Sequence, residues 1–514
     1  MERIERWGVF EAAVPGRAEG NPFTDYEIQA TFTGSQETRT VEGFYDGDGT
    51  WRVRFMPSFE GEYTYRIYGN FSDRETEGHF LVTAPGPNNH GPVRVHNRYH
   101  LAWEDGTPHY SLGTTCYTFD LQREEIVEET FRELEKGYFN KMRFCLFPKH
   151  YDFCLYDPIA FPYEGTPMDA SVLTRENFDQ YNGNPPGNHW NFTRFNPAFF
   201  QIHDRTIRRL MDMGIEADLI LFHAYDRWGF SQMSMEDNRR YLRYVAARYS
   251  AFRNVWWALA NEYELLHHSE ADWDLLGEEL RAHDPYGHLL SIHNCEVFYD
   301  YSKDWITHCS CQRCDHYRTT ESTDELRMKY GKPVVWDEFG YEGDFPHCWG
   351  NFTPEEIVRR SWEALLRGGY CGHGETFLSD DNIIWWAHGG RLKGQSAERF
   401  RFMRDFLADV PGCGLKLAKL RDDKHFQWDD KVAVPEDPRY EGTWYFFYYS
   451  LWQPSFRQIW VDDTTWFDVD VIDTWQMTVT PIGRRRGRFN IPLGTKQYMG
   501  IRLRKSEVQE ESLS

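Results

Sequence analysis

The chain has 514 residues, with 57 Lys and Arg against 80 Asp and Glu, which gives a formal net charge of −23. This acidic balance argues against a nucleic-acid or anionic-membrane partner, because both reward clustered basic side chains. The one basic cluster, at residues 484–488, is predicted to be a solvated turn between strands. No apolar run approaches the length of a membrane-spanning helix, and the charged first residues do not resemble a secretory signal, so we expect a cytoplasmic protein.

The N-terminal part of the chain has the pattern of short strands. Runs such as YEIQATFTG and GEYTYRIYG alternate with Asp-Gly and Gly-Asn turn signals. We therefore expect residues 1–84 to form a small antiparallel β-sandwich of the immunoglobulin-like kind. A linker rich in Pro, Gly and Asn extends from there to residue 97.

Residues 98–409 alternate short apolar runs with segments of helical periodicity. The strand candidates are, in order, HYSLGTTCYTF, NKMRFCLFP, IEADLILFHAY, NVWWALANEYE, HLLSIHN, WITHCSCQ, PVVWDEFG and GGYCGHGETF. Their number and order predict an α/β fold, a (β/α)₈ barrel with its active groups at the C-terminal ends of the strands. A doubly wound sheet would also alternate, but no Gly-rich phosphate fingerprint follows the first strand. Strand patterns return over residues 410–514 and predict a C-terminal all-β domain.

Three of the predicted barrel strands end in carboxylates, namely Glu262 on strand four, Glu338 on strand seven and Glu375 on strand eight. A carboxylate directly after a buried strand is costly unless it is hydrogen-bonded or used chemically. Two carboxylates that face each other across a barrel suit glycoside hydrolysis, in which one acid protonates the leaving oxygen and the other group attacks or stabilises the sugar. The Trp-rich surroundings would raise the pKa of one of the two by desolvation.

These strand ends resemble a known clan of enzymes. Asn261-Glu262 on strand four and Glu338 before Phe-Gly on strand seven resemble the retaining (β/α)₈ glycoside hydrolases that include β-galactosidases and cellulase-like enzymes. The run HNRYHLAWEDGTPHYSLGTTCYTF, together with SIHN, HGETF and IIWWAHGG, is more similar to the apiosidase-like bacterial branch. Members of that branch often carry an N-terminal Ig-like domain and a C-terminal β-domain, and the resemblance spans nearly the whole chain.

The resemblance implies roles for individual residues. Glu338 resembles the nucleophile of the clan, and Glu262 resembles its general acid/base. Asn261 resembles the asparagine that hydrogen-bonds the sugar 2-hydroxyl, and Arg143 in NKMRF resembles the strand-two arginine that positions the nucleophile. The role of Glu262 is carried over from the wider clan.

Each of these assignments has a structural alternative. For Glu262 the alternative is a carboxylate paired with Arg143 or with a nearby histidine, although the catalytic interpretation is favoured. Asp337 competes with Glu338, because alternation along a strand sends neighbouring side chains to opposite faces. Glu375 suits substrate binding or a salt bridge better than catalysis.

Further polar and aromatic side chains near the predicted strand ends are candidates for sugar binding. A single histidine at such a position is commonly structural, but four around one rim suggest a sugar site. Trp385 and its neighbour Trp386 would offer a stacking platform, and the loop over residues 151–196 is long enough to wall a pocket. The histidines are His223, His293, His308 and His373.

Cys309, Cys311 and Cys314 are close enough in sequence to suggest zinc ligands. Their spacing matches no closed four-ligand pattern, so we expect neither a metal nor another cofactor. The remaining cysteines are scattered, which fits reduced thiols better than a disulfide framework.

The sequence therefore predicts a cytoplasmic glycoside hydrolase that retains configuration and acts from one end on short oligosaccharides or glycosides. A protein of another class, a carbohydrate-binding or scaffold protein that keeps the barrel without catalysis, is the alternative. The flanking β-domains would complete the pocket, bind sugar or mediate assembly into a homo-oligomer. Which sugar and which linkage are recognised stays open.

Overall fold

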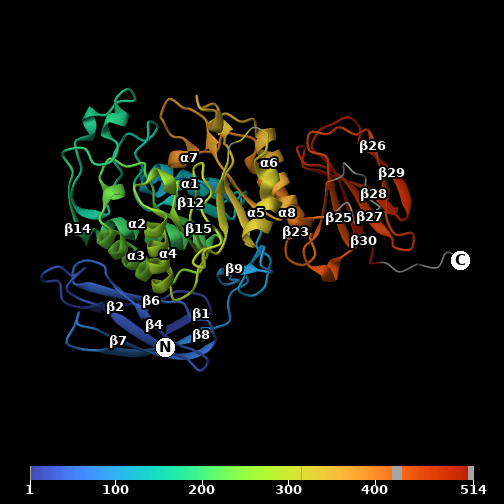
Figure 1. The fold of residues 1–514 in the computed structure, drawn as a ribbon. Coiled ribbons are helices and arrows are strands. Elements are labelled where there is room, and N and C mark those ends of the chain that lie inside the picture. Colours follow the sequence, from blue (N-terminus) through green and yellow to red (C-terminus); the bar gives the residue numbers. More distant parts are fainter. Residues whose placement is uncertain (1, 314, 316, 419–430, 508–514) are drawn as a thin grey trace.

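The computed structural model describes residues 2–313, 315, 317–418 and 431–507. Its centre is a parallel eight-stranded sheet that curls into a nearly closed barrel (Figure 1). All of the predicted strands are present, and the edge strands meet at an isolated parallel bridge between His293 and Ser310. Around the barrel they are β17 (Leu290–Ser291), β16 (Val255–Ala260), β15 (Glu216–Phe222), β12 (Lys141–Cys145), β11 (Leu112–Thr115), β21 (Tyr370–His373), β19 (Val334–Glu338) and β18 (Cys309–Gln312).

Helices connect most of the barrel strands and cover the outside of the barrel. Thr353 shows how the sequence sets their starts, because its side chain accepts a hydrogen bond from the backbone N–H of Glu356 and Pro354 occupies the first helical position. The connection from β17 to β18, whose residues are all described, contains no helix. The helices are α1 (Glu124–Leu134), α2 (Pro197–Asp212), α3 (Met235–Tyr249), α4 (Glu270–His283), α5 (Thr323–Tyr330), α6 (Pro354–Leu366), α7 (Trp385–His388) and α8 (Ala397–Leu407).

Short strand pairs accompany the barrel. A hairpin leads into the first barrel strand, a second hairpin lies within the long insertion after β12, and a parallel pair follows β19 and β21. They are β9 (Val93–His96) with β10 (His100–Trp103), β13 (Tyr163–Thr166) with β14 (His189–Phe195), and β20 (Glu342–Gly343) with β22 (Glu375–Thr376).

A buried charged layer crosses the barrel interior. Lys141 Nζ lies 2.9 Å from Asp218 Oδ2 and 2.5 Å from Asp337 Oδ1. Arg143 Nη1 lies 3.2 Å from the same oxygen of Asp218, and the Ser310 hydroxyl donates to Asp337. Buried charges are tolerated when they are paired and hydrogen-bonded, so this cluster ties β12, β15, β18 and β19 together directly beneath the strand ends.

The N-terminal residues form a β-sandwich, as predicted. All of its strand pairs are antiparallel except β1 with β8, which is parallel and differs from the expected pattern. Figure 1 shows the sandwich in blue against helices α2 to α4. Its five-stranded sheet contains β1 (Glu2–Glu5), β8 (Thr76–Thr83), β7 (Gly61–Tyr68), β3 (Gln29–Thr33) and β4 (Thr38–Glu42), and its three-stranded sheet contains β2 (Phe10–Pro15), β6 (Thr50–Phe55) and β5 (Phe44–Tyr45).

Arg54 connects the sandwich to two helices of the barrel domain. Its guanidinium lies 2.8 Å from Asp204 Oδ1 on α2 and donates to the backbone carbonyl of Arg248 on α3. Aromatic side chains fill the sandwich core, where the rings of Phe32 and Phe55 stack with centroids 4.2 Å apart. The immunoglobulin-like topology of this domain stays a prediction.

The C-terminal residues form the predicted all-β domain, drawn in red in Figure 1 beside α5 and α8. The basic run at 484–488 ends β28, forms the turn at residues 486 and 487 and begins β29, so the predicted turn between strands is present within it. The six-stranded sheet contains β23 (Leu415–Leu417), β24 (Val432–Pro435), β25 (Trp444–Tyr448), β30 (Met499–Lys505), β27 (Phe467–Asp473) and β28 (Thr478–Arg485), and β26 (Phe456–Trp460) pairs with β29 (Arg488–Pro492).

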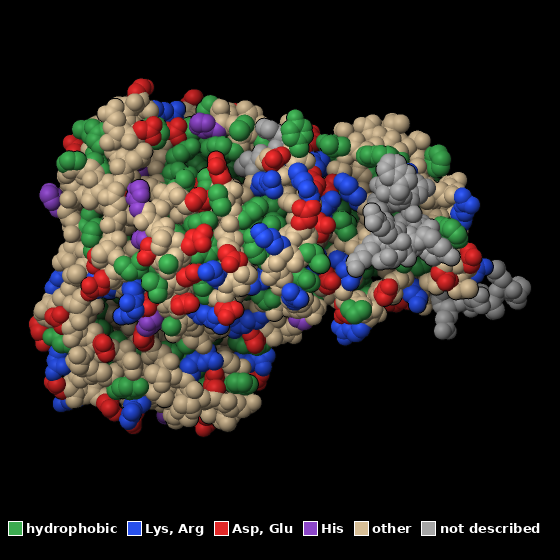
Figure 2. Space-filling view, viewed as in Figure 1, with side chains coloured by type: hydrophobic (Ala, Val, Ile, Leu, Met, Phe, Trp, Pro, Cys, Tyr) green, Lys and Arg blue, Asp and Glu red, His purple; other side chains and the backbone are tan. Residues whose placement is uncertain are grey.

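Charged side chains of both signs are interleaved over the face shown in Figure 2. This distribution fits a solvated surface rather than a patch that steers one kind of charged partner. None of the helices in the described part of the chain is long and apolar enough to span a membrane.

Candidate active site

Glu338 ends β19, and its carboxylate lies at the C-terminal end of the barrel. Oε1 accepts a hydrogen bond from the Tyr117 hydroxyl, and His293 Nε2 lies 3.5 Å from the same oxygen. Burial raises the pKa of Glu338, but the contacts with His293 and Tyr117 and the charge of Arg143 outweigh burial and lower this pKa to about 2. Glu338 is therefore ionised at neutral pH, which is the state that a nucleophile requires.

Glu262 follows β16 in an uncommon backbone conformation. Its φ of 50° and ψ of 59° are left-handed, which costs a non-glycine residue about 1–3 kcal/mol and is found most often at functional sites. Tyr225 donates to Oε2, Gln312 Nε2 lies 3.0 Å from Oε1, and Asn261 Nδ2 lies 3.4 Å from Oε2. Within the described residues, Glu262 forms no ion pair with Arg143 or with a histidine, which was the structural alternative for this carboxylate.

His293 and Gln312 connect the two carboxylates. His293 Nε2, which faces Glu338, also lies 3.2 Å from Gln312 Oε1, and the amide of Gln312 donates to Glu262. On its other side, His293 Nδ1 lies 3.0 Å from the Ser310 hydroxyl. One hydrogen-bonded group therefore contains side chains from four neighbouring parts of the barrel. They are Glu262 after β16, His293 after β17, Gln312 on β18 and Glu338 on β19.

Arg143 contacts Asn261 rather than the carboxylate of Glu338. Its Nη2 donates to Asn261 Oδ1 at 3.0 Å, while Nη1 faces Asp218. In the described part of the chain, the influence of Arg143 on Glu338 is electrostatic, through its positive charge. Arg143 thus fixes the side chain of Asn261, the residue expected to meet a sugar hydroxyl.

Asp337, the competitor of Glu338, points into the barrel. Both of its oxygens are engaged, one by Lys141 and the other by Ser310. Burial raises the pKa of Asp337, but the charges of Lys141 and Arg143 hold it well below its usual range. Asp337 therefore has a structural role in the charged layer. Glu338, and not Asp337, is the carboxylate of β19 that lies at the C-terminal end of the barrel.

Two of the four candidate histidines lie at the C-terminal end of the barrel strands, namely His293 and His223. His223 follows β15 and is buried, with Nε2 3.3 Å from the Phe147 carbonyl oxygen and no hydrogen-bond partner for Nδ1 among the described residues. Burial and the charge of Lys149 lower the pKa of His223 to about 3, so its imidazole is neutral.

The other two histidines lie away from the two carboxylates. His308 precedes β18 and packs on Trp256 near the start of β16, which places it toward the opposite end of the barrel. His373 faces the helix layer, where its ring packs on Phe139 and Phe400 and its Nε2 lies 3.1 Å from the Ser396 hydroxyl. The expected ring of four histidines around one rim is therefore not formed.

Glu375 joins a second buried cluster beside α8. Its Oε2 accepts the backbone N–H groups of residues 393 and 394, and burial raises the pKa of Glu375 to about 7. Glu342 accepts the backbone N–H groups of residues 395 and 396. Ligand atoms of Glu342, Glu375 and His373 lie within 4.8 Å of one another, the spacing of a possible cation site, but the hydrogen bonds show that both carboxylates hold the chain that leads into α8.

Of the two neighbouring tryptophans, Trp386 and not Trp385 lies beside Tyr117, the tyrosine that donates to Glu338. Trp385 Nε1 donates to Thr114 Oγ1 at 2.8 Å, and its ring packs in the core of the barrel. The ring centroid of Trp386 is 5.2 Å from that of Tyr117. Tyr151 lies on the other side of Trp386, at 5.5 Å, so the insertion after β12 does contribute to this end of the barrel.

Four residues of the site were not selected from the sequence. Each ends a barrel strand or follows one within a few positions, so proximity to a strand end was the available signal. They are Tyr117, Lys149, Tyr225 and Gln312.

The cysteines of β18 belong to the core. Cys309 and Cys311 are buried and free, and burial raises the pKa of both thiols. Cys314, the third member of the sequence cluster, lies outside the described residues.

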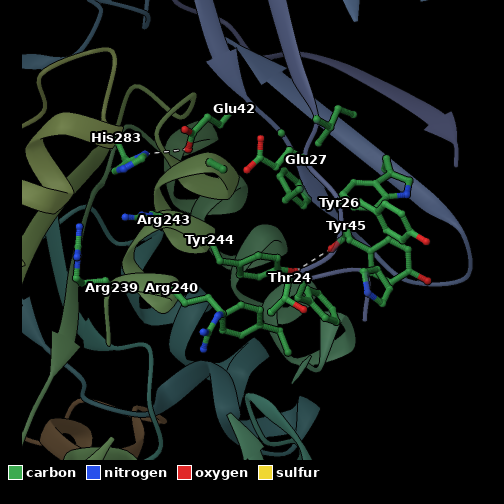
Figure 3. Close-up of a pocket in the computed structure, with 18 of the residues that line it drawn as sticks. Thr24, Tyr26, Glu27, Glu42, Tyr45, Arg239, Arg240, Arg243, Tyr244 and His283 are labelled. Carbon is green, nitrogen blue, oxygen red and sulfur yellow. Dashed lines mark hydrogen bonds and ion pairs between the residues drawn. The ribbon is translucent and has the colours of Figure 1, made fainter. Parts of the chain in front are cut away.

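A separate groove of about 860 Å³ lies between the N-terminal sandwich and α3 (Figure 3). Aromatic side chains of the sandwich, including Tyr26 and Tyr45, face arginines of the helix across it. Arg239 and Arg243 are already paired with Glu279. The groove therefore lies at the junction of the sandwich and the barrel, and two of its arginines already have a carboxylate partner. None of the carboxylates at the ends of the described barrel strands lines it.

Comparison with known proteins agrees with this arrangement. Residues 95–435 match the apiosidase-like catalytic domain, residues 3–70 match a domain of unknown function (DUF5060), and residues 428–504 match another (DUF5605). No curated protein matches the chain.

Solved structures extend the comparison over the whole chain. A candidate glycoside hydrolase from Bacteroides vulgatus ATCC 8482 is 34% identical, with a TM-score of 0.87 over 98% of this chain and 100% of that one. A glycoside hydrolase of family 5 from the same organism is 15% identical, with a TM-score of 0.60 over 84% of this chain and 97% of that one, and shows a shared fold. The chain belongs to the apiosidase-like family, and its catalytic barrel has the fold of the glycoside hydrolases.

Proposed function

We propose that this protein hydrolyses O-glycosidic bonds with retention of configuration, with Glu338 as nucleophile and Glu262 as general acid/base. One observation carries the proposal: two strand-end carboxylates share a hydrogen-bonded group, and the one on β19 is held ionised by Tyr117 and His293. A permanently ionised carboxylate beside a second one is the pair that double displacement needs.

In the first step, an oxygen of Glu338 attacks the anomeric carbon while the proton of Glu262 passes to the leaving glycosidic oxygen. The bond to the leaving group breaks and a covalent glycosyl ester of Glu338 forms. In the second step, Glu262 removes a proton from water, the water oxygen attacks the anomeric carbon, and Glu338 is released. Asn261, whose Oδ1 accepts a hydrogen bond from Arg143, would bind the sugar 2-hydroxyl.

Chemical rescue tests the assignment of the nucleophile. Glu338→Ala should abolish hydrolysis of activated aryl glycosides, and azide should restore turnover with a glycosyl azide of inverted configuration as product. The stereochemistry of the wild-type product, followed by NMR in the first minutes of reaction, should show retention. Inversion by the wild type, or full activity of Glu338→Ala, would contradict the proposed mechanism.

We also propose that the enzyme acts from the end of its substrate. The insertion between β12 and α2 supports this proposal, because its residue Tyr151 packs beside Trp386, and long ordered loops at this end of a barrel commonly wall a binding site. Digestion of a reducing-end-labelled oligosaccharide should release monosaccharide first, whereas early products of mixed length would indicate internal cleavage.

A further inference from the structure

Lys149 places a buried ammonium group next to both carboxylates. Its side chain follows β12 and is 4% exposed. The Nζ atom lies 3.6 Å from the ring centroid of Tyr117 and 4.2 Å from that of Tyr225. These are the two tyrosines whose hydroxyls donate to Glu338 and Glu262, so Lys149 lies between the residues that hold the catalytic pair.

The walls around this ammonium group are aromatic. Besides the two tyrosines, the ring centroids of Trp386 and Tyr151 lie 4.4 Å and 5.4 Å from Nζ. Aromatic faces attract a cation but supply neither a counter-charge nor a conventional acceptor for its N–H groups. Among the described residues, Lys149 has neither a hydrogen-bond partner nor an ion-pair partner.

An unpaired buried lysine is unusual, because a buried charge is costly unless a partner is present. Both oxygens of Glu262 and Oε1 of Glu338 are bound by tyrosine, histidine and amide groups, and among the described residues no hydrogen bond or ion pair joins either carboxylate to Lys149. A second orphan polar atom lies at this end of the barrel, since Nδ1 of the buried His223 also has no partner in the described part of the chain. Tyr151, Tyr225 and Gln312 are half-buried, so this region is in contact with solvent.

We propose that Lys149 binds an anionic substituent, a carboxylate or a sulfate ester, on the sugar whose anomeric carbon is attacked. The proposal rests on the glycosidase function above and deepens it by naming the substrate class. The two carboxylates act on Lys149 only through their charge, so the anion would supply the direct ion pair and hydrogen bonds that this ammonium lacks among the described residues. The aromatic walls would exclude water around that ion pair. A neutral sugar would leave the ammonium buried and unpaired, so the same residue would also disfavour neutral substrates.

Matched glycosides test the proposal. Aryl glycosides of gluco and galacto configuration, each as α and β anomers, are prepared with CH₂OH, COO⁻ or CH₂OSO₃⁻ at C5. Wild-type kcat/KM should favour one of the anionic forms by about 100-fold over its neutral counterpart, the scale expected when a buried charge loses its partner. The carboxylate and sulfate arms distinguish the two sources of negative charge.

Lys149→Met keeps the length of the side chain and removes its charge. This variant should reduce the preference for the anionic substrate to a few-fold, whereas Lys136→Met, at a surface lysine, should keep the wild-type ratio. If the wild type shows no anionic preference, or if Lys149→Met retains the preference, the proposed role of Lys149 is overturned while the glycosidase function stands.

Binding provides a readout that does not need turnover. Glu338→Gln, titrated calorimetrically with the hexuronic acid and the hexose of the preferred configuration, should bind the acid more tightly, and the combined variant with Lys149→Met should lose this difference. Equal binding of acid and hexose would contradict the proposal. Absence of both turnover and binding across the whole panel would contradict the glycosidase function as well.

Discussion

The imidazole of His293 contacts the carboxylate of Glu338, with Nε2 3.5 Å from Oε1. His293 is the largest of the influences that lower the pKa of Glu338 against the effect of burial. A residue after one barrel strand thus sets the ionisation of a carboxylate that ends another strand.

Removal of this contact should shift the acidic side of the pH–rate profile. In His293→Ala, the pKa of Glu338 should rise from about 2 toward or above its ordinary value of 4.5, because burial is then opposed by fewer interactions. The acidic limb of kcat/KM, measured between pH 3 and 8, should therefore move to higher pH, because Glu338 stays ionised over this range in the wild type but not in the variant. His308→Ala removes a buried histidine that lies away from Glu338 and should leave this limb in place, and a common shift in both variants would contradict the specific role of His293.

The two tyrosines should affect different steps. Tyr117→Phe removes a donor from the nucleophile Glu338 and should lower kcat/KM by about 10- to 100-fold, since a hydrogen bond to a charged group contributes about 1.5–3 kcal/mol. Tyr225→Phe removes a donor from the acid/base Glu262 and should slow substrates with poor leaving groups more than those with good ones. A series of aryl glycosides of graded leaving-group pKa measures both effects, and identical slopes for the two variants would contradict the division of roles.

The sequence contained enough to predict the barrel strands, because each is a short apolar run followed by polar residues. Glu262 and Glu338 could be found for the same reason. His308 shows where this reasoning fails: the run WITHCSCQ was taken as one strand, but β18 begins at Cys309, so His308 lies before the strand and not after it.

Contacts between residues of different barrel strands could not be predicted from the sequence. The proximity of Lys149 to Tyr117 and Tyr225 depends on how three strands curve around the barrel, which no local pattern encodes. Trp385 and Trp386 illustrate the same limit, since neighbours in one short helix face different surroundings and only the closed barrel decides which ring lies beside the catalytic residues.

The charged layer should be essential for stability. Asp337→Asn removes one of the two counter-charges of buried Lys141 and should lower the free energy of unfolding by about 3–5 kcal/mol, as expected for breaking a buried ion pair. Asp468→Asn breaks a half-exposed pair with Arg484 and should cost less than about 1 kcal/mol. Urea unfolding at pH 7 compares the two variants, and equal losses would show that the barrel does not depend on this ion pair.

Glu375 should make stability depend on pH. Its pKa is raised from an ordinary value of 4.5 to about 7, so the folded protein binds this proton more tightly than the unfolded chain does. The resulting stabilisation is complete below pH 4.5 and is lost as the pH rises through about 7. Between pH 5 and pH 8, the wild type should lose roughly 1–3 kcal/mol more unfolding free energy than Glu375→Gln, whose side chain does not titrate.

Denaturant unfolding at several pH values measures this difference. The amide of Glu375→Gln still offers an oxygen to the N–H groups of residues 393 and 394, so the variant should fold and retain the chain that leads into α8. Glu398→Gln, on the exposed face of α8, should follow the wild-type pH dependence, because the surroundings of an exposed side chain change little on unfolding. Parallel curves for the wild type and Glu375→Gln would show that Glu375 is ionised throughout this range and that burial alone does not keep its proton in place.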